Sequence, residues 1–465
     1  MALTIAIVGG GIGGLTAAIA LRQHPGIQVQ VYERASEFQE VGALIGLAPN
    51  GLRTLEKLGV QGVLEDELGW RNPTGTPTFT KHWRAGDVVS NNAYERVPDR
   101  RHHFSRMHRA LLQKELLKKL PEDILHPGKD VTEVQVSEDD VTVFFKDKTS
   151  TTVDLVIGAD GIRSQVRKTL VPQYKLMGWG DAMFRATFPY ELVQDIEGLD
   201  QDSTRWQSPT SWFFASRLGT KGYGVTFNFN ANTKELDDLK KPLEDVVWNS
   251  PASVDDVRDA FKVRLPSPSN LQHPTQSRES PNNHILPGIS PSCPRNHQPD
   301  TTRTLRRYTN AFGPKLDTWT FADRVVLIGD AAHAHGGAFG AGASLAIDDA
   351  YTLYLALRAV FPQALPISRP IRRSHIGLAL DLYESVRRPH AARVLDIVLQ
   401  DRQKQFARNE GLKAAGKEES DQDFRERMKG RKGAAWLHEH DVEKAFQEAI
   451  TRRFSSGEQN GHGNP

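Results

Sequence analysis

Runs of consecutive apolar residues at 5–8, 155–157 and 325–328 stand out from the mixed pattern of the rest of the chain. Strands that are apolar on both faces lie inside parallel sheets, because helices cover both sides of such sheets. Residues 15–22, rich in Ala and Leu, follow the first run with helical character, and residues 28–32 continue as a second strand. The pattern predicts an α/β fold built on a parallel sheet.

Alternation of apolar and polar residues predicts antiparallel structure elsewhere. Residues 131–152 alternate around a turn at 146–148, and residues 70–104 carry the signals of a further hairpin. From 175 to 261 the chain is strand-like and rich in aromatic residues. We expect a second, mainly antiparallel domain here, inserted before the first is complete, with its aromatic residues more often in the core than in contact with substrate.

The remaining segments are polar or helical. Residues 263–307 are dominated by Pro, Ser, Asn, His and Arg and lack apolar periodicity, so we expect a disordered or loosely attached insertion. A long helix is predicted at 381–405, with a kink or break before Pro389. An amphipathic helix at 436–454 and a disordered tail at 455–465 close the chain.

A glycine motif follows the first apolar run. Gly9, Gly11 and Gly14 match G-x-G-x-x-G, and Glu33 ends the second strand at the spacing where dinucleotide-binding folds place an acid. Gly9 permits the tight turn, Gly11 lets the backbone approach a pyrophosphate, and Gly14 lets helix and strand pack closely. Because Glu33 accepts hydrogen bonds from a ribose 2′-OH, it disfavours a 2′-phosphate there. The motif predicts dinucleotide binding.

Two further acids follow predicted strands. Asp160 and Gly161 form a turn after residues 155–158, and Ser164 is placed to cap the next helix. Asp330 follows the run at 325–328, and the glycine-rich residues 336–344 then lead into a helix. In this arrangement an acid at a strand end is followed by glycines at the start of a helix. Such a segment can bring its backbone close to a phosphate or a ribityl chain.

Composition narrows the class of protein. Lys and Arg number 59 against 57 Asp and Glu among 465 residues, a formal charge of +2 that argues against a nucleic-acid partner. The single cysteine excludes an intramolecular disulfide and a thiolate metal cluster, which fits a reducing compartment. No apolar run approaches the roughly 20 residues of a membrane helix, and residues 1–4 lack the basic segment of a signal peptide. We expect a cytoplasmic enzyme, monomeric or homodimeric, with no metal site and no integral membrane segment.

The three acid and glycine motifs together resemble those of the single-component FAD-dependent aromatic hydroxylases, of the salicylate hydroxylase and para-hydroxybenzoate hydroxylase type. The similarity runs from about residue 5 to 398, outside 263–307, and residues 436–442 are also of that type. It implies an α/β, Rossmann-like FAD-binding domain with an inserted mainly antiparallel β substrate domain and C-terminal helices. The expected divisions are 1–174 and 308–400 for the FAD-binding domain, 175–262 for the substrate domain, 263–307 for the insertion, 401–454 for the C-terminal helices and 455–465 for the tail.

The resemblance also implies roles for individual residues. Glu33 would hold the adenosine ribose, Arg109 would lie against the pyrophosphate and ribityl region, and Asp330 would bond the ribityl hydroxyls. Asp160 lies in a segment linked to both FAD and NAD(P)H. The loop at 336–344 would pass the pyrimidine edge of the isoalloxazine. The full set of expected cofactor-binding residues is Gly9, Gly11, Gly14, Glu33, Ala43, Arg109, Asp160, Asp330, Gly342 and Ala343.

The implied reaction is the hydroxylation of a phenolic or aromatic-acid substrate, and we expect it to be a step in secondary metabolism. NAD(P)H would reduce FAD, and O₂ would form a C4a-hydroperoxide whose terminal oxygen attacks an electron-rich ring carbon. The sequence identifies no catalytic base. Arg185, as a clamp for a carboxylate or phenolate or as one half of a surface pair, and Tyr223 are candidates. His333 and His335 lie beside the flavin loop, where packing is favoured over base catalysis.

Two positions depart from the family pattern, and alternatives stay open. Gly337 stands where the family usually has proline, and Leu44 where many members have glycine. A related flavoprotein that epoxidises, dearomatises or oxidises a natural-product intermediate would carry the same motifs. A binding protein of the GDP-dissociation-inhibitor kind would leave Asp330, Arg109 and the loop glycines unexplained. An NAD-dependent dehydrogenase would explain only the first motif.

Overall fold

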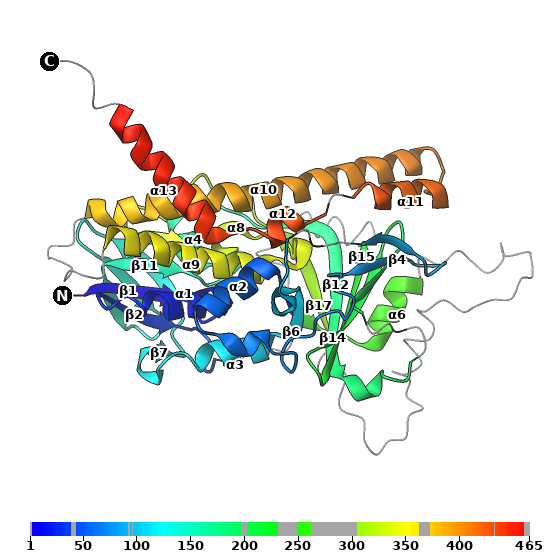
Figure 1. The fold of residues 1–465 in the computed structure, drawn as a ribbon, viewed down its shortest axis with the longest axis horizontal. Helices are drawn as coiled ribbons and strands as arrows, with labels where there is room; N and C mark the ends of the chain where they lie inside the picture. Colours follow the sequence, from blue (N-terminus) through cyan, green and yellow to red (C-terminus); the bar gives the residue numbers. More distant parts are fainter. Residues whose placement is uncertain are drawn as a thin grey trace, which may run out of the picture.

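The structure is a computed structural model, shown in Figure 1. It describes residues 2–38, 43–91, 94, 96–196, 199, 202–230, 249–262, 305–361, 373–431 and 433–459. Of the expected insertion, residues 263–304 lie outside this described part of the chain.

A six-stranded sheet with the order β18-β19-β11-β1-β2-β7 forms the first half of the molecule. Its central strands are parallel, as the apolar runs predicted, and only β18 is antiparallel to its neighbour. The strands are β1 (Leu3–Val8), β2 (Ile27–Tyr32), β7 (Leu125–His126), β11 (Leu155–Gly158), β18 (Thr320–Phe321) and β19 (Val325–Leu327).

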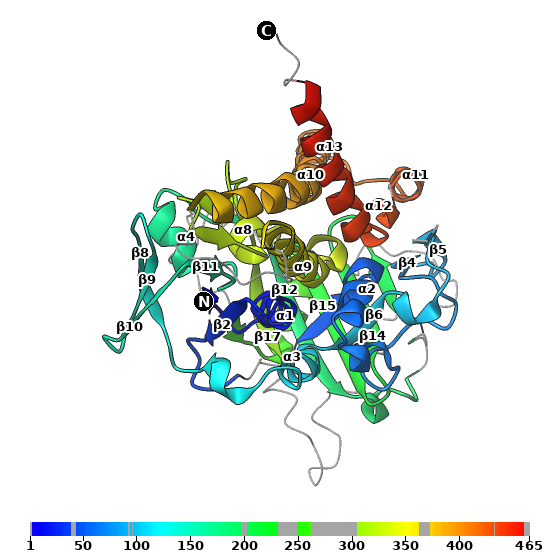
Figure 2. The same cartoon turned by 60° about the vertical axis from the view of Figure 1, so that its left-hand side comes forward.

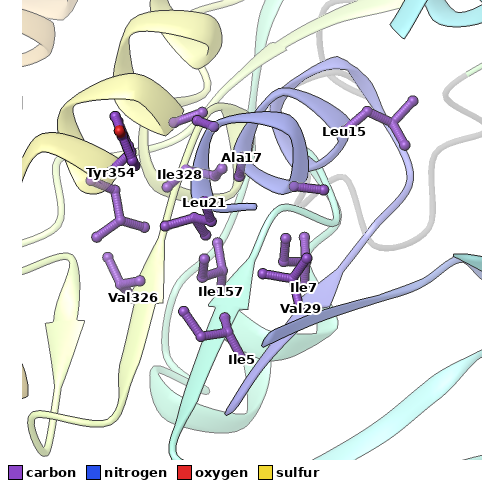
Figure 3. Packing of buried hydrophobic residues seen from close by; sticks show 14 of the residues in the cluster. Ile5, Ile7, Leu15, Ala17, Leu21, Val29, Ile157, Val326, Ile328 and Tyr354 are labelled. Carbon is purple, nitrogen blue, oxygen red and sulfur yellow. The ribbon is translucent and has the colours of Figure 1, made fainter. Parts of the chain in front are cut away.

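Helices α1 (Ile12–Leu21) and α9 (Gly342–Val360) are buried against this sheet. Ile7 of β1 pairs with Ile157 of β11, and both are fully buried. Figure 3 shows the side chains of the sheet meeting those of α1 and of the α9 segment. The expected α/β fold is confirmed, because the apolar runs lie at the centre of the sheet.

A small antiparallel sheet stands beside the parallel one (Figure 2). It contains β8 (Val131–Val136), β9 (Val141–Phe145) and β10 (Ser150–Val153), in the order β10-β9-β8. The hairpin predicted around 146–148 is the β9–β10 connection, where Lys148 has a positive φ of 69°.

The third sheet has eight strands in the order β16-β17-β12-β15-β14-β13-β4-β5. Most neighbours are antiparallel, and β13 and β4 are parallel. The strands are β4 (Phe79–His82), β5 (Val88–Asn91), β12 (Met177–Pro189), β13 (Thr204–Gln207), β14 (Trp212–Leu218), β15 (Gly222–Asn230), β16 (Asn249–Pro251) and β17 (Arg306–Phe312).

This sheet gathers strands from both sides of the segment 175–262, so the expected divisions at 174 and 308 do not separate the two halves. β4 and β5 precede the segment, and β17 follows it. Arg306 and Arg307, which we assigned to the insertion, lie in β17 and pair with Arg185 and Phe184. β17 pairs with β12, and β4 pairs with β13, through backbone hydrogen bonds. The local sequence does not predict pairing between strands so far apart in the chain.

The C-terminal helices cover the molecule on one side (Figures 1 and 2). α10 runs without interruption from Arg373 to Ala414 and contains Pro389, so the helix is not broken there, and the kink that was the other expectation stays a prediction. α11 (Asp421–Lys429) buries Phe424 and Met428 against Val89 of β5. The single helix predicted at 436–454 is divided into α12 (Ala435–His438) and α13 (Val442–Gln459), and α13 extends into the expected tail.

The other helices are short, and they include α2 (Pro49–Lys57), α3 (Arg109–Leu117), α4 (Gln165–Leu170), α6 (Val254–Lys262) and α8 (Asp330–His333). β3 (Leu44–Leu47) and β6 (Ser105–His108) pair with each other. None of the helices in the described part of the chain combines the length and apolar character needed to cross a membrane.

Candidate active site

A cavity of about 430 Å³ lies between the parallel sheet and the eight-stranded sheet. Cofactor and substrate pockets usually have volumes of this order, and in α/β folds they lie beyond the carboxyl ends of the parallel strands. Gly10, Glu33 and Asp330 line the cavity from those strand ends, and Arg185 and Tyr308 line it from the eight-stranded sheet. The two halves of the molecule therefore contribute to one site.

The glycine motif has the geometry that each of its positions needs. Gly9 adopts a φ of +109°, and a side chain there would meet the carbonyl oxygen of Ala159 at 2.4 Å. At Gly14 a Cβ would lie 2.0 Å from the carbonyl oxygen of Gly9. A Cβ on Gly11 would instead meet no atom within 4 Å, because this residue faces the cavity. The turn is packed on one side and open on the side where a pyrophosphate would approach.

Backbone N–H groups are directed to the same place. Gly11 is the N-cap of α1, and no side chain caps this helix, which leaves its positive dipole end available to an anion. Glu33 accepts hydrogen bonds from the backbone N–H of Gly10 at 2.7 Å and of Ala35 at 2.9 Å. The Glu33 carboxylate therefore stabilises the glycine turn through the N–H of Gly10, and Glu33 also lines the cavity.

Gln113 is a residue of this site that sequence reasoning missed. Its Nε2 donates to the carbonyl oxygen of Gly10 at 3.1 Å, and its side chain lines the cavity. It belongs to α3, whose first residue is Arg109, another residue of the cavity lining. The carbonyl of Ala43 accepts from the backbone N–H of Arg109 at 2.9 Å, which joins two expected cofactor residues. A single glutamine on a predicted helix carries no signal that would have identified it.

Asp330 begins α8 directly after Gly329, whose φ is +58°. Its side chain is exposed and lines the cavity, as a residue that bonds a ribityl chain requires. The loop that follows contains further positive φ values at Gly336, Gly337, Phe339 and Gly340. Gly337 has a φ of +71°, which proline, fixed near −65°, does not reach. A proline at position 337 could therefore not adopt the backbone conformation that Gly337 has here.

Gly342 and Ala343 are the first two residues of α9, and both are partly exposed. They lie outside the lining of the cavity, as far as the described residues define it.

Asp160 takes a different position from the other two acids. Its Oδ2 accepts from the backbone N–H groups of Gln165 at 2.7 Å and Val166 at 3.1 Å, at the start of α4. Burial raises the pKa of this carboxyl. The Ser164 hydroxyl accepts from the N–H of Arg167 at 2.9 Å, which confirms the predicted cap. Asp160 thus holds the helix that follows, while its neighbour Ile162 lines the cavity.

The two residues considered for catalysis lie in different surroundings. Arg185 lines the cavity, with its guanidinium carbon 5.3 Å from the ring centre of Tyr308, so it is not half of a surface pair. Burial lowers the pKa of Arg185; Tyr308 acts against this shift, and Arg109 adds to it. Tyr223 is 2% exposed in a hydrophobic cluster and stacks on Phe188 at 5.8 Å. The structure places Tyr223 in the core of the sheet, where aromatic residues were generally expected.

The two histidines near the loop, His333 and His335, also differ in their surroundings. His333 Nε2 lies 2.6 Å from Oδ2 of Asp349, and Asp349 Oδ1 accepts from Nε of Arg387 at 2.8 Å. Although burial alone would raise the pKa of Asp349, His333 and Arg387 hold it well below its usual range. His333 is therefore part of a buried network, in line with the favoured packing role. Burial lowers the pKa of His335 to about 4, so this ring is neutral near pH 7.

Comparison with known proteins gives matches over most of the chain. Residues 2–205 and 315–398 match the family model described as "FAD binding domain". The chain is 30% identical to the salicylate hydroxylase of Pseudomonas putida over 374 residues, which cover 76% of each protein. It is 28% identical to a 6-methylsalicylate 1-monooxygenase of Aspergillus terreus over 375 residues, 76% of this chain and 74% of that protein.

Solved structures share the fold. A salicylate hydroxylase in complex with substrate matches with a TM-score of 0.69 at 20% identity, covering 96% of this chain and 98% of that one. Klebsiella pneumoniae HpxO, complexed with FAD and uric acid, matches with a TM-score of 0.65 at 22% identity, covering 96% and 97%. At these identities the structures support the fold alone.

Proposed function

Because this chain belongs to the family of FAD-binding aromatic hydroxylases, we propose that its substrate is a phenol or an aromatic acid and that it acts in secondary metabolism. The chain is an FAD-dependent monooxygenase, a class in which NAD(P)H is the typical reductant. The observation that carries the proposal is the cavity that joins the glycine turn and Asp330 to Arg185 and Tyr308. Relatives named for salicylate and 6-methylsalicylate support a hydroxylated benzoate as the substrate class.

The residues that line the cavity suit FAD. Gly11 and the uncapped start of α1 would hold the pyrophosphate, Glu33 the adenosine ribose, and Asp330 the ribityl hydroxyls. Bound FAD supplies electron transfer from NAD(P)H to O₂ and the insertion of one oxygen atom into the substrate. The exposed position of Asp330 in the cavity, free of any ion pair in the described structure, is consistent with a role towards hydroxyl groups.

The chain's own contribution is to position the substrate and to exclude water. Met183 and Tyr308 present apolar and aromatic surface to the cavity from neighbouring strands, and the guanidinium of Arg185 adds a charge beside both side chains. A dry site matters because water favours the release of peroxide without product. The eight-stranded sheet would therefore form the wall against which the aromatic ring lies.

We expect Asp330→Ala to weaken FAD binding by the apoprotein about tenfold, the loss of roughly one hydrogen bond to a charged group. Fluorescence titration of the apoprotein with FAD measures this constant. Asp396→Ala, at a surface carboxylate paired with Lys315, is the matched control and should bind FAD like the wild type. An unchanged constant for Asp330→Ala would mean that Asp330 does not contact the cofactor.

The proposed activity is tested with a panel of hydroxybenzoates and phenols. The purified protein should be yellow, and one panel member should stimulate the consumption of NADH or NADPH with little peroxide release. Mass spectrometry should find one added oxygen in a product that keeps its aromatic absorbance. Loss of that absorbance would favour the epoxidising or dearomatising alternative, and protein without flavin would contradict the proposal. Metabolite profiling after gene deletion tests the role in secondary metabolism.

A further inference from the structure

A group of arginines lies on the same face of the eight-stranded sheet as the FAD cavity, but away from the cavity lining. Arg205 of β13 lies opposite Phe214 of β14, which in turn lies opposite Thr226 of β15. Thr226 lies opposite Arg185 of β12. Because residues directly opposite each other on antiparallel strands point to the same face, Arg205 and Arg185 share a face. Three strand spacings separate their backbones by about 14 Å, so the two arginines belong to different sites.

A chain of contacts joins Arg205 to the end of α10. Its guanidinium carbon lies 4.5 Å from the ring centre of Trp212. Trp212 lies opposite Asn228, whose Nδ2 donates to Oδ2 of Asp181 at 2.9 Å. Nη2 of Arg402, in α10, donates to the same oxygen at 2.7 Å, and Asp181 is fully buried. This ion pair therefore holds the end of α10 over the eight-stranded sheet, where it lies in Figure 1.

Arg205 has no carboxylate partner among the residues that the structure describes. Its Nε is buried without a hydrogen-bond partner. Burial lowers the pKa of Arg205 well below its usual range, and two more cations, Arg431 and Arg402, add to this shift. Both of these cations have an acid nearby, since Arg402 pairs with Asp181 and Asp401 acts on Arg431. Enclosing a guanidinium among cations without its own counter-charge is costly, so an anion is expected beside Arg205.

The place is open to solvent on the side of the C-terminal helices. Arg431 directly follows α11 and is exposed, and the side chain of Arg402 is 30% exposed. The three guanidinium groups come from β13, from α10 and from the segment after α11. An anion from solution can therefore reach Arg205 by passing Arg431, without entering the FAD cavity.

We infer that Arg205, Arg402 and Arg431 bind a phosphate group where β13 meets the C-terminal helices. A phosphate carries a charge of about −1.5 to −2 near pH 7 and several terminal oxygens, so it can accept from guanidinium groups on different elements. The ring of Trp212 supports the guanidinium of Arg205 from one side. Free phosphate and a phosphate carried by a larger molecule, such as the 2′-phosphate of NADPH, share this chemistry. The inference does not depend on the proposed function.

The test is a calorimetric titration of the FAD-loaded protein with inorganic phosphate, at an ionic strength held constant with NaCl. FAD occupies the dinucleotide site, so phosphate cannot bind there. The wild type should bind one phosphate per chain with a Kd of about 1 mM or lower. Arg205→Gln should weaken this binding about tenfold or more, because it removes charge-assisted hydrogen bonds. Arg431→Gln should also weaken it.

Thermal unfolding separates a binding role of Arg205 from a structural one. Because Arg205→Gln removes a cation without a counter-charge, the variant should fold and should melt no earlier than the wild type in phosphate-free buffer. Phosphate at ten times its Kd should raise the melting temperature of the wild type by about 1 °C or more, and it should leave Arg205→Gln unchanged.

Two control variants locate the bound phosphate. Arg217→Gln removes an arginine of the same sheet that also stacks on aromatic rings, with its guanidinium carbon 4.2 Å from the ring centres of Trp70 and Tyr190. Arg185→Gln removes the cation of the eight-stranded sheet that lines the FAD cavity. Both variants should bind phosphate like the wild type.

Competition with NADP⁺ and NAD⁺, which do not reduce the flavin, identifies the source of the phosphate. Displacement of phosphate by NADP⁺ but not by NAD⁺ would assign the site to the 2′-phosphate of the reductant, and displacement by neither would assign it to free phosphate. Three results would overturn the inference. They are a wild type that binds no phosphate, an Arg205→Gln protein that binds it as the wild type does, and loss of binding in Arg185→Gln.

Discussion

Gly11→Val is expected to give a folded protein that has lost its flavin, whereas Gly14→Ala should lose both stability and flavin. A Cβ at Gly11 enters open space, and its φ of −77° suits any residue, so folding is unaffected. The side chain would fill the space through which the pyrophosphate approaches the N–H groups of α1. We expect the affinity of the apoprotein for FAD to fall at least about tenfold, or roughly 1.4 kcal/mol.

At Gly14 the added carbon would lie 2.0 Å from a backbone oxygen, which no side-chain rotation relieves. Overpacking of this kind costs about 1–3 kcal/mol, so the apoprotein itself should melt earlier. Thermal unfolding of apoprotein and holoprotein, with FAD titration, measures both effects. Gly411→Ala, in an open position on α10, is the control for the added methyl group. Equal flavin loss without destabilisation in both variants would contradict the separate roles of the two glycines.

Asp349→Asn is expected to destabilise the protein by about 3–5 kcal/mol, the usual cost of breaking a buried ion pair. Arg387 and Asp349 are both fully buried, so the variant removes the carboxylate that is paired with a guanidinium in the core. Denaturant unfolding of the apoprotein measures the loss. Asp396→Asn breaks the exposed pair with Lys315 and should cost no more than about 1 kcal/mol. A similar loss of unfolding free energy in both variants would show that the buried pair contributes no more to stability than the exposed one.

The same network predicts a dependence on pH. The folded-state pKa of Asp349 is held below its unfolded value, so its contribution is fully present above about pH 4. The contribution is lost as the pH falls through the folded-state pKa. The wild type should therefore lose more stability than Asp349→Asn between about pH 4 and pH 2.

Asp349 also contacts the backbone of the candidate cofactor site. Its Oδ2 accepts from the backbone N–H of Gly329 at 2.9 Å, directly before Asp330. The network of His333, Asp349 and Arg387 thus holds the strand end that carries the expected ribityl ligand. A weaker affinity for FAD in Asp349→Asn would follow from displacement of Gly329, without any contact between Asp349 and the cofactor.

The local sequence predicted the structure correctly where a single short segment determines the backbone conformation. The apolar runs became the centre of the parallel sheet, Ser164 became the cap of α4, and Gly9, Gly11 and Gly14 have the conformations that their spacing predicted. Each depends on contacts within a few residues or on burial of a continuous apolar strand. Such conformational preferences follow from the types of the residues in the segment itself.

Only the tertiary structure decided which distant side chains meet. It recruited β4, β5 and β17 into the eight-stranded sheet, placed Tyr223 in the core, and turned Asp160 towards α4 instead of the cavity. It also brought Gln113 to Gly10 and left Arg185 beside Tyr308 without an acid among the described residues. The sequence by itself determined the parallel core and the conformation of the glycine turn that is expected to hold the dinucleotide. The eight-stranded sheet, which we propose forms the substrate wall, depends on strand pairing between residues far apart in the sequence, and local preferences do not encode such pairing.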